Sequence, residues 1–212
     1  MKRFIHAALT IVCTLALACG MAACGGNGAG VDDGSNDNPD LNAGDPNADQ
    51  GSSGYTTWTD GLYEIGKDIP AGEYVIIAQP GAKITFRLAT DASKSFDSLI
   101  ALESCENRTI LYVEDGEFLE FSGGTMYVIN EAPAVSTAGN LFEGTYKIGL
   151  DLPAGTYTIG SIDSEHPGYY AISSSSRHSF ADIISSEEFI GTVTITVTNG
   201  QYLSLRLAEL IR

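Results

Sequence analysis

One segment of this chain occurs twice, and this repetition restricts the fold more than any other feature of the sequence. Residues 61–74 follow the pattern Gly-x-Tyr-x-x-Gly-x-Asp-Ile-Pro-Ala-Gly-x-Tyr, and residues 144–157 repeat it with leucine in place of the isoleucine. A second segment, Asp-Gly-Glu-Phe-Leu at 115–119, returns as Asn-Gly-Gln-Tyr-Leu at 199–203. Self-similarity of this length predicts two similar units rather than one large core.

The repetition also sets the domain boundaries. We assign repeat 1 to residues 55–131 and repeat 2 to residues 137–212, with the Ala-Pro-Ala-Val-Ser segment 132–136 as a connector. A repeat of about 75 residues is near the lower size limit for an independent hydrophobic core. We therefore expect the two repeats to pack against each other.

Apolar residues alternate with polar ones along both repeats. The segments 83–88, 192–198 and 203–207 each place apolar side chains at every second position, with threonine, serine or charged residues between them. Period two with many β-branched residues predicts strands. The predicted fold class is all-β, as two tandem small antiparallel β-sandwich or jelly-roll-like domains that follow a signal peptide and a disordered linker.

Two short segments show a different spacing. Phe96, Leu99 and Ile100 lie three and four positions apart, and residues 180, 183 and 184 repeat that spacing in the second copy. An i, i+3, i+4 spacing is typical of one face of a helix. We therefore expect a short helical turn at each place.

The residues kept in both copies are most simply explained as a turn. The proline fixes φ, the glycine two positions later can adopt positive φ, and the aspartate before them can accept turn N–H groups. We expect the flanking tyrosines, Tyr63 with Tyr74 and Tyr146 with Tyr157, to pack across a hairpin. A paired ligand site at these tyrosines and aspartates is the alternative. The residues assigned to the structural turn are Asp68, Pro70, Gly72, Asp151, Pro153 and Gly155.

The N-terminus has the features of a secretion signal. A basic start, Lys2-Arg3, precedes an apolar stretch at 4–18, which is shorter than a membrane span. Small residues then precede Cys24, and glycines follow it. Residues 1–23 thus resemble the signal peptide of bacterial lipoproteins, which implies that Cys24 carries lipid and anchors the chain to a membrane. Cys19 is the alternative lipidation site, and an ordinary secretory signal is the alternative to lipidation.

Residues 24–54 are expected to form a disordered acidic tether behind the lipidated cysteine. They are rich in Gly, Asn, Asp, Ser and Pro and contain no aromatic residue. Asp32–Asp40 has some features of a calcium loop, but its register is wrong and its terminal glutamate is missing. Cys105 is the one cysteine beyond the anchor region, and we expect a buried apolar role for it.

Charge and chemistry exclude several function classes. The chain has 27 acidic and 11 basic residues, a balance that opposes binding to nucleic acid. Neither the histidines nor the cysteines have the spacing of a zinc site, and no glycine-rich phosphate loop follows a strand. We therefore predict no cofactor, no metal site and no catalytic residues.

The repeat pattern, which closes on Asp/Asn-Gly-x-Phe/Tyr-Leu, is similar to a module of secreted and lipid-anchored proteins in Gram-positive bacteria. That resemblance covers residues 55–212. It implies an extracellular all-β module without an assigned activity, and it supplies no catalytic residues to carry over.

Features that the second copy does not share are the candidates for specificity. Adjacent tyrosines such as Tyr169 and Tyr170 can stack on a sugar or a peptide, although a strand would turn one of them toward the core. The serine run 173–176 with His178 and Asp182 contains hydrolase residue types but lacks a nucleophile elbow. The candidate ligand contacts are Tyr169, Tyr170 and His178.

These observations favour a non-catalytic lipoprotein on the extracellular face of the cell membrane. Its candidate partners are the membrane, through the lipid, and a glycan, a peptide or another envelope protein. A structural spacer or a self-associating surface protein is the alternative, and an envelope hydrolase is a third hypothesis. The sequence predicts no oligomeric state.

Overall fold

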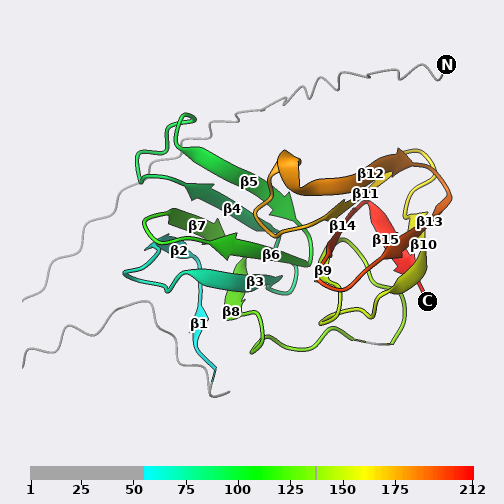
Figure 1. Cartoon of the computed structure of the whole chain (residues 1–212), viewed down its shortest axis with the longest axis horizontal. Helices are drawn as coiled ribbons and strands as arrows, with labels where there is room; N and C mark the ends of the chain where they lie inside the picture. The colour runs from blue at the N-terminus through cyan, green and yellow to red at the C-terminus, as the bar shows by residue number, and fades with distance from the viewer. Residues whose placement is uncertain (1–54, 137) are drawn as a thin grey trace, which may run out of the picture. The chain divides into compact units, whose positions relative to one another are not determined.

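The computed structural model describes residues 55–136 and 138–212, and both repeats lie in one compact unit. Within these residues the structure is all-β, apart from one short 3₁₀ turn (Figure 1). The strands of repeat 1 are β1 (Thr57–Trp58), β2 (Gly61–Glu64), β3 (Gly72–Ala78), β4 (Ile84–Ala89), β5 (Leu99–Cys105), β6 (Arg108–Val113), β7 (Phe118–Ser122) and β8 (Gly124–Val128). Those of repeat 2 are β9 (Gly144–Lys147), β10 (Gly155–Ser161), β11 (Gly168–Ser173), β12 (Ile183–Phe189), β13 (Thr192–Val197), β14 (Tyr202–Arg206) and β15 (Ala208–Ile211), and the turn η1 (Phe180–Asp182) precedes β12.

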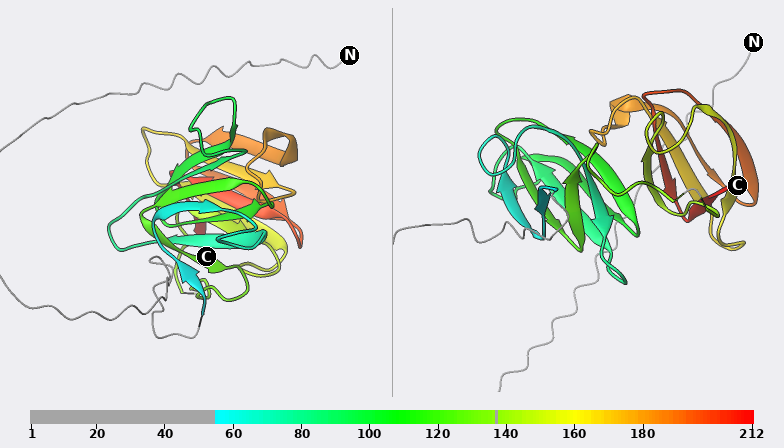
Figure 2. Two further views of the ribbon diagram at one scale, coloured as in Figure 1. Left: turned by 90° about the vertical axis from the view of Figure 1, so that its left-hand side faces the viewer. Right: turned by 90° about the horizontal axis from the view of Figure 1, so that it is seen from below.

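The strands of the described part of the chain form four antiparallel sheets, two in each repeat (Figure 2). Repeat 1 has the orders β1-β8-β3-β6 and β2-β7-β4-β5, and repeat 2 has the orders β13-β10-β15 and β12-β11-β14-β9. When each strand of repeat 2 is replaced by its counterpart in repeat 1, the orders agree. β1 has no full counterpart strand, but Leu141 forms a single bridge to Leu210 in the corresponding place. The duplicated sequence therefore folds twice into the same topology.

Each repeat has its own buried hydrophobic cluster, to which both of its sheets contribute. In β4, Ile84, Phe86 and Leu88 are at most 1% exposed, as their alternation with polar residues predicted. Leu203 and Leu205 of β14 are buried too. Leu207 is an exception, because it leaves the strand with a φ of 47° and its side chain is exposed. Cys105 is a free thiol within the repeat 1 cluster, in agreement with its predicted apolar role.

The predicted helical turns are wrong at the first site and reduced to one 3₁₀ turn at the second. Phe96 lies in a loop and is 87% exposed, while Leu99 and Ile100 begin β5. Phe180 opens η1 and is 84% exposed, and Ile183 begins β12. At each site the first apolar residue of the pattern lies outside the strand in which the later ones lie. These apolar residues therefore do not share a helical face.

The shared motif is an arch between two sheets, not the hairpin that the sequence suggested. β2 pairs with β7 in one sheet, while β3 pairs with β6 and β8 in the other. The aspartates act as predicted: Asp68 Oδ2 accepts the Glu64 N–H at 2.8 Å, and Asp151 Oδ2 accepts the Lys147 N–H at 2.8 Å. Each arch is therefore closed by its own carboxylate.

The positive-φ glycines of the arch are Gly66 (φ 88°) and Gly149 (φ 96°), which stand before the aspartate. Gly72 has a φ of 159°, close to extended backbone, so the expected left-handed turn after the proline is not the one formed. A Cβ on Gly66 would lie 2.8 Å from Asp115 Oδ1. The arch therefore needs glycine at this position both for its backbone and for its space.

The motif tyrosines bind backbone oxygens four residues upstream. Tyr74 Oη donates to Pro70 O and Tyr157 Oη donates to Pro153 O, both at 2.7 Å. Tyr63 stacks on Phe121 rather than across a hairpin. These tyrosines therefore fix the ends of the arch, which accounts for their presence in both copies.

Candidate binding site

The loop after β11 covers the outer edge of β6 and joins the two repeats. The Tyr112 N–H donates to Ser176 O at 3.2 Å, and Arg177 Nη1 donates to Tyr112 O at 3.1 Å. His178 Nε2 donates to Ile110 O at 2.8 Å. The edge strand of repeat 1 thus obtains backbone partners from repeat 2, as expected if the repeats pack together.

Charged groups strengthen this contact. Arg177 forms a bidentate ion pair with the buried Glu117, in which Nη1 lies 2.9 Å from Oε2 and Nη2 lies 2.7 Å from Oε1. Glu103 binds Arg206 on one side and His178 Nδ1 on the other, the latter at 2.5 Å. His178 has a φ of 57°, which is uncommon for a residue with a side chain.

Glu103 is the most strongly perturbed carboxyl group at the junction. Its burial raises the pKa, but the hydrogen bond and charge of His178, together with Arg206, outweigh burial and lower the pKa to about 2. Glu103, which lies between His178 and Arg206, therefore stays ionised over the whole physiological pH range.

Glu73, on β3, is a second anchor. It accepts hydrogen bonds from Ser176 Oγ at 2.8 Å and from the Tyr202 hydroxyl, and it forms an ion pair with Lys147. Lys147 also lies over the Tyr202 ring, 5.5 Å from its centroid. Beside these polar groups is a small buried apolar cluster, consisting of Val75, Ile110, Ile129 and Tyr202.

Arg108 and Asp151 form the most buried ion pair across the junction. Arg108 Nη2 lies 3.1 and 3.2 Å from the two oxygens of Asp151, and the two side chains are only 9% and 7% exposed. The guanidinium lies 5.4 Å from the centroid of the Tyr146 ring. A Cβ on Gly144 would lie 2.9 Å from Arg108 Cγ, so this approach needs a glycine. Asp151 thus serves both its own arch and the junction.

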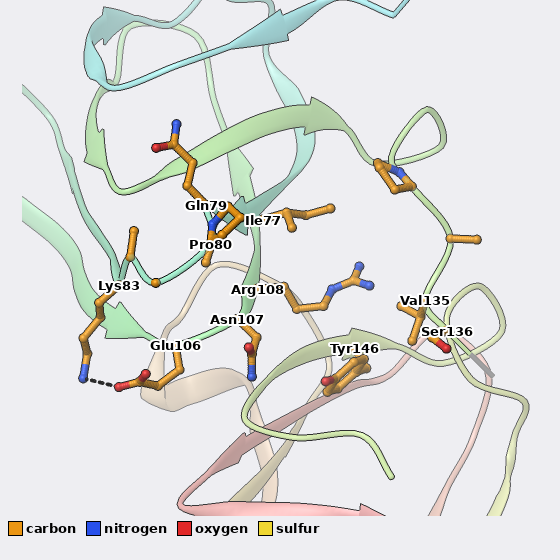
Figure 3. Close-up of a pocket in the computed structure, with 15 residues that line it drawn as sticks. Ile77, Gln79, Pro80, Lys83, Glu106, Asn107, Arg108, Val135, Ser136 and Tyr146 are labelled. Carbon is orange, nitrogen blue, oxygen red and sulfur yellow. Dashed lines mark hydrogen bonds and ion pairs between the residues drawn. The ribbon is translucent and has the colours of Figure 1, made fainter. Parts of the chain in front are cut away.

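A pocket of about 610 Å³ opens beside this ion pair (Figure 3). It is lined by residues 77–83 and 106–108 of repeat 1, by residues 133–136 of the connector and by Tyr146 of repeat 2. Lys83 Nζ and Glu106 Oε1 form an ion pair of 3.1 Å at its margin. The volume is in the range of small-ligand sites. The pocket exists only because the connector and both repeats meet there.

The candidate contacts named from the sequence are not gathered at this pocket. Tyr170 is buried against Phe189, so the strand turns it into the core, as the alternation required. Tyr169 faces the other way and lies opposite Arg206 in the ladder. Arg206 binds Glu103, which binds His178, so Tyr169 and His178 flank one ion-pair cluster.

The serine run shows no hydrolase geometry. Ser175 Oγ donates to Asp182 Oδ2 at 2.6 Å, and Ser176 Oγ donates to Glu73. The hydrogen bonds of His178 go to a carboxylate and a carbonyl, whereas a triad requires a serine–histidine bond. The polar groups of this segment are used to hold the repeats together.

The sequence reasoning missed the anchors on repeat 1. Their counterparts in repeat 2 are different residues: Glu73 corresponds to Thr156, Arg108 to Thr192 and Glu117 to Gln201. This difference between the two copies could have identified the anchors, since a residue present in only one copy is not needed for the shared fold.

Among residues 55–136 and 138–212, no cluster of three or more His, Cys, Asp or Glu side chains is placed to hold a metal. In the same residues, no helix is long and apolar enough to cross a membrane. Cys19, Cys24, the tether and Asp32–Asp40 lie outside the described residues. Comparisons with protein-family models, with curated proteins and with solved structures gave no match.

Proposed function

We propose that this protein is a lipid-anchored extracellular module that binds its ligand without catalysis, in the pocket at the junction of its repeats. In this proposal each repeat is a small antiparallel β-sandwich, since its two sheets share one hydrophobic cluster. The signal-like segment 1–23 and Cys24 supply the anchor, and residues 25–54 supply a tether that holds the module away from the membrane.

The pocket is the observation that carries this proposal. Its lining comes from both repeats and the connector, so its shape depends on the Arg108–Asp151 and Glu73–Lys147 pairs that fix the repeats. A preformed site loses less entropy when a ligand binds. Glu103 has its pKa lowered to about 2 and is paired with His178 and Arg206, which leaves it poorly suited to proton transfer.

The pocket lining favours a neutral ligand with polar edges and apolar faces. Ile77, Pro80 and Val135 offer apolar surface, while Gln79 and Asn107 carry amides that can donate and accept. The Lys83–Glu106 and Arg108–Asp151 pairs contribute no net charge. A glycan or a short peptide matches this chemistry better than an anion or a cation.

Filling the pocket tests the proposal. The purified full chain, held in non-ionic detergent, would be applied to glycan arrays and peptide libraries beside the variant Ala134→Trp, which places an indole in the pocket. Ala92→Trp is the matched control, because Ala92 is also an exposed loop alanine but lies outside the pocket. Binding by the wild type and by Ala92→Trp, with at least tenfold weaker binding by Ala134→Trp, is expected. Equal binding by all three proteins would contradict a role for the pocket.

The alternative role is that of a structural spacer, favoured by the charged and apolar contacts that fix the two repeats. Stacking of many copies through the same contact is disfavoured. The free edge of repeat 2 presents Thr192, Thr194 and Thr196 where β6 presents Arg108, Ile110 and Tyr112. A spacer would show no ligand on the arrays.

A further inference from the structure

The outer edge of β13 is open, whereas the equivalent edge in repeat 1 is covered. In the described residues, β13 pairs only with β10 and ends its sheet. Its counterpart β6 also ends a sheet, but the loop from repeat 2 supplies partners for Ile110 O and for both backbone groups of Tyr112. In the described residues, the edge of β6 is therefore hydrogen-bonded to the loop from repeat 2, whereas the equivalent edge of β13 is free.

The register shows which backbone groups of β13 are free. Tyr112 lies opposite Glu73 in the β3–β6 ladder, and Thr196 lies opposite Thr156 in the β10–β13 ladder. Tyr112 points its N–H and C=O away from β3, since both bind repeat 2. By the same alternation, Thr194 and Thr196 point their N–H and C=O groups away from β10. Each can exchange two backbone hydrogen bonds with a further strand.

The other outer strands carry the usual protection against such pairing. β5 contains Glu103, β2 contains Glu64, β9 contains Lys147, β12 contains Glu187 and Glu188, β15 contains Glu209, and β1 has only two residues. β13 contains no charged residue and no proline. In a chain with 27 acidic and 11 basic residues, this neutral edge is where two copies can approach without placing like charges opposite each other.

The sequence of this edge is also its own reverse. Residues 192–198 read Thr-Val-Thr-Ile-Thr-Val-Thr in both directions, with Ile195 at the centre. An antiparallel pair of identical strands is related by a two-fold axis, and a palindromic strand presents the same residues to itself across that axis. Pairing about Ile195 would place Thr194 opposite Thr196 of the other copy. That pair has the outward N–H and C=O groups that a hydrogen-bonded position requires.

We propose that β13 pairs antiparallel with β13 of a second copy, about a two-fold axis at Ile195. The two sheets then continue as one. Val193, Ile195 and Val197 stay on the core face, and the exposed threonines form one outer face. Threonine pairs of this type already occur within the chain, where Thr156 Oγ1 and Thr196 Oγ1 lie 3.1 Å apart. This pairing does not depend on the pocket and would hold even if no ligand bound there.

Hydrogen exchange locates the contact directly. Exchange of the peptide that contains residues 192–197 would be followed by mass spectrometry for the full chain in detergent, at low and high chain concentration. The outward amides of Thr194 and Thr196 are expected to become protected as concentration rises. Thr194→Lys places a charge at the edge of each copy and should weaken this protection at least tenfold on the concentration scale. Thr158→Lys is the control, since Thr158 is an exposed threonine of the same sheet on the paired strand β10.

A second variant distinguishes loss of the strand pairing from loss of the fold. Thr194→Pro removes an N–H that faces away from β10, a substitution that edge strands accept. It should abolish the concentration-dependent protection, while the amides of β10 stay as slow to exchange as in the wild type. Exchange in 192–197 that is independent of concentration would overturn the proposal. Protection that requires an added unrelated strand-forming peptide, or that survives Thr194→Lys, would overturn it too.

Discussion

Replacing Glu103 by glutamine removes one charge from the junction and keeps the shape of the side chain. Glu103 is 10% exposed and lies between His178 and Arg206. Its folded pKa of about 2 is compared with an ordinary value of 4.5. A depression of this size corresponds to about 3 kcal/mol of folding free energy at neutral pH. We expect Glu103→Gln to lose an amount of that order at pH 7.

The loss must depend on pH in a definite direction. A carboxyl group with a depressed folded pKa stabilises the protein above its unfolded pKa, and this contribution is lost as the pH falls through the folded pKa. The difference in unfolding free energy between wild type and Glu103→Gln should therefore be constant above pH 5. It should shrink from about pH 4.5 and be nearly gone at pH 2.

Urea unfolding at pH 7, 5, 3 and 2 measures this difference as a shift of the midpoint. Glu120→Gln is the control, because its pair with Lys94 is exposed and such pairs contribute about 0–1 kcal/mol. A Glu103→Gln variant no less stable at pH 7 than Glu120→Gln would show that the charge of Glu103 does not stabilise the junction. A destabilisation that stays the same at pH 2 would show this as well, since the charge would not be its source.

Two further predictions concern packing. Gly144→Ala should destabilise the protein by about 1–3 kcal/mol in thermal unfolding, because the new Cβ would lie 2.9 Å from Arg108 Cγ and 3.0 Å from Arg108 O; an unchanged melting temperature would mean that the junction is looser than described. Burial raises the pKa of the Cys105 thiol to about 12, so iodoacetamide at pH 8 should modify Cys105 only after unfolding, as read by peptide mass spectrometry. Rapid modification of Cys105 in the folded protein would contradict its placement in the core.

The sequence predicted the all-β class because alternation is a local property. Ile84, Phe86 and Leu88 alternate with polar residues within one strand, and the structure buries all three. The helical turns failed for a related reason. A spacing of three and four residues arose where the exposed Phe96 happened to precede Leu99 and Ile100 at the start of β5. Spacing alone does not reveal whether residues share an element.

The arch and the junction depend on distant pairing, which local residue types do not report. Pro-Ala-Gly fits a turn, but whether β3 returns beside β2 or enters another sheet is decided by β6, β7 and β8. The packing of the repeats against each other could be expected from their size alone. The residues that make this contact could not be predicted, because Glu73 and Arg108 contact partners 74 and 43 positions away in the chain.

Mapping where a ligand contacts the chain tests the pocket most directly. The best ligand from the arrays would be titrated into the isotope-labelled protein, and amide chemical shifts would be followed by NMR. We predict that the perturbed amides gather in residues 77–83, 106–108 and 133–136, which line the pocket. Shifts that gather instead around Tyr169 and His178, with the pocket amides unchanged, would show that the junction pocket is not the binding site.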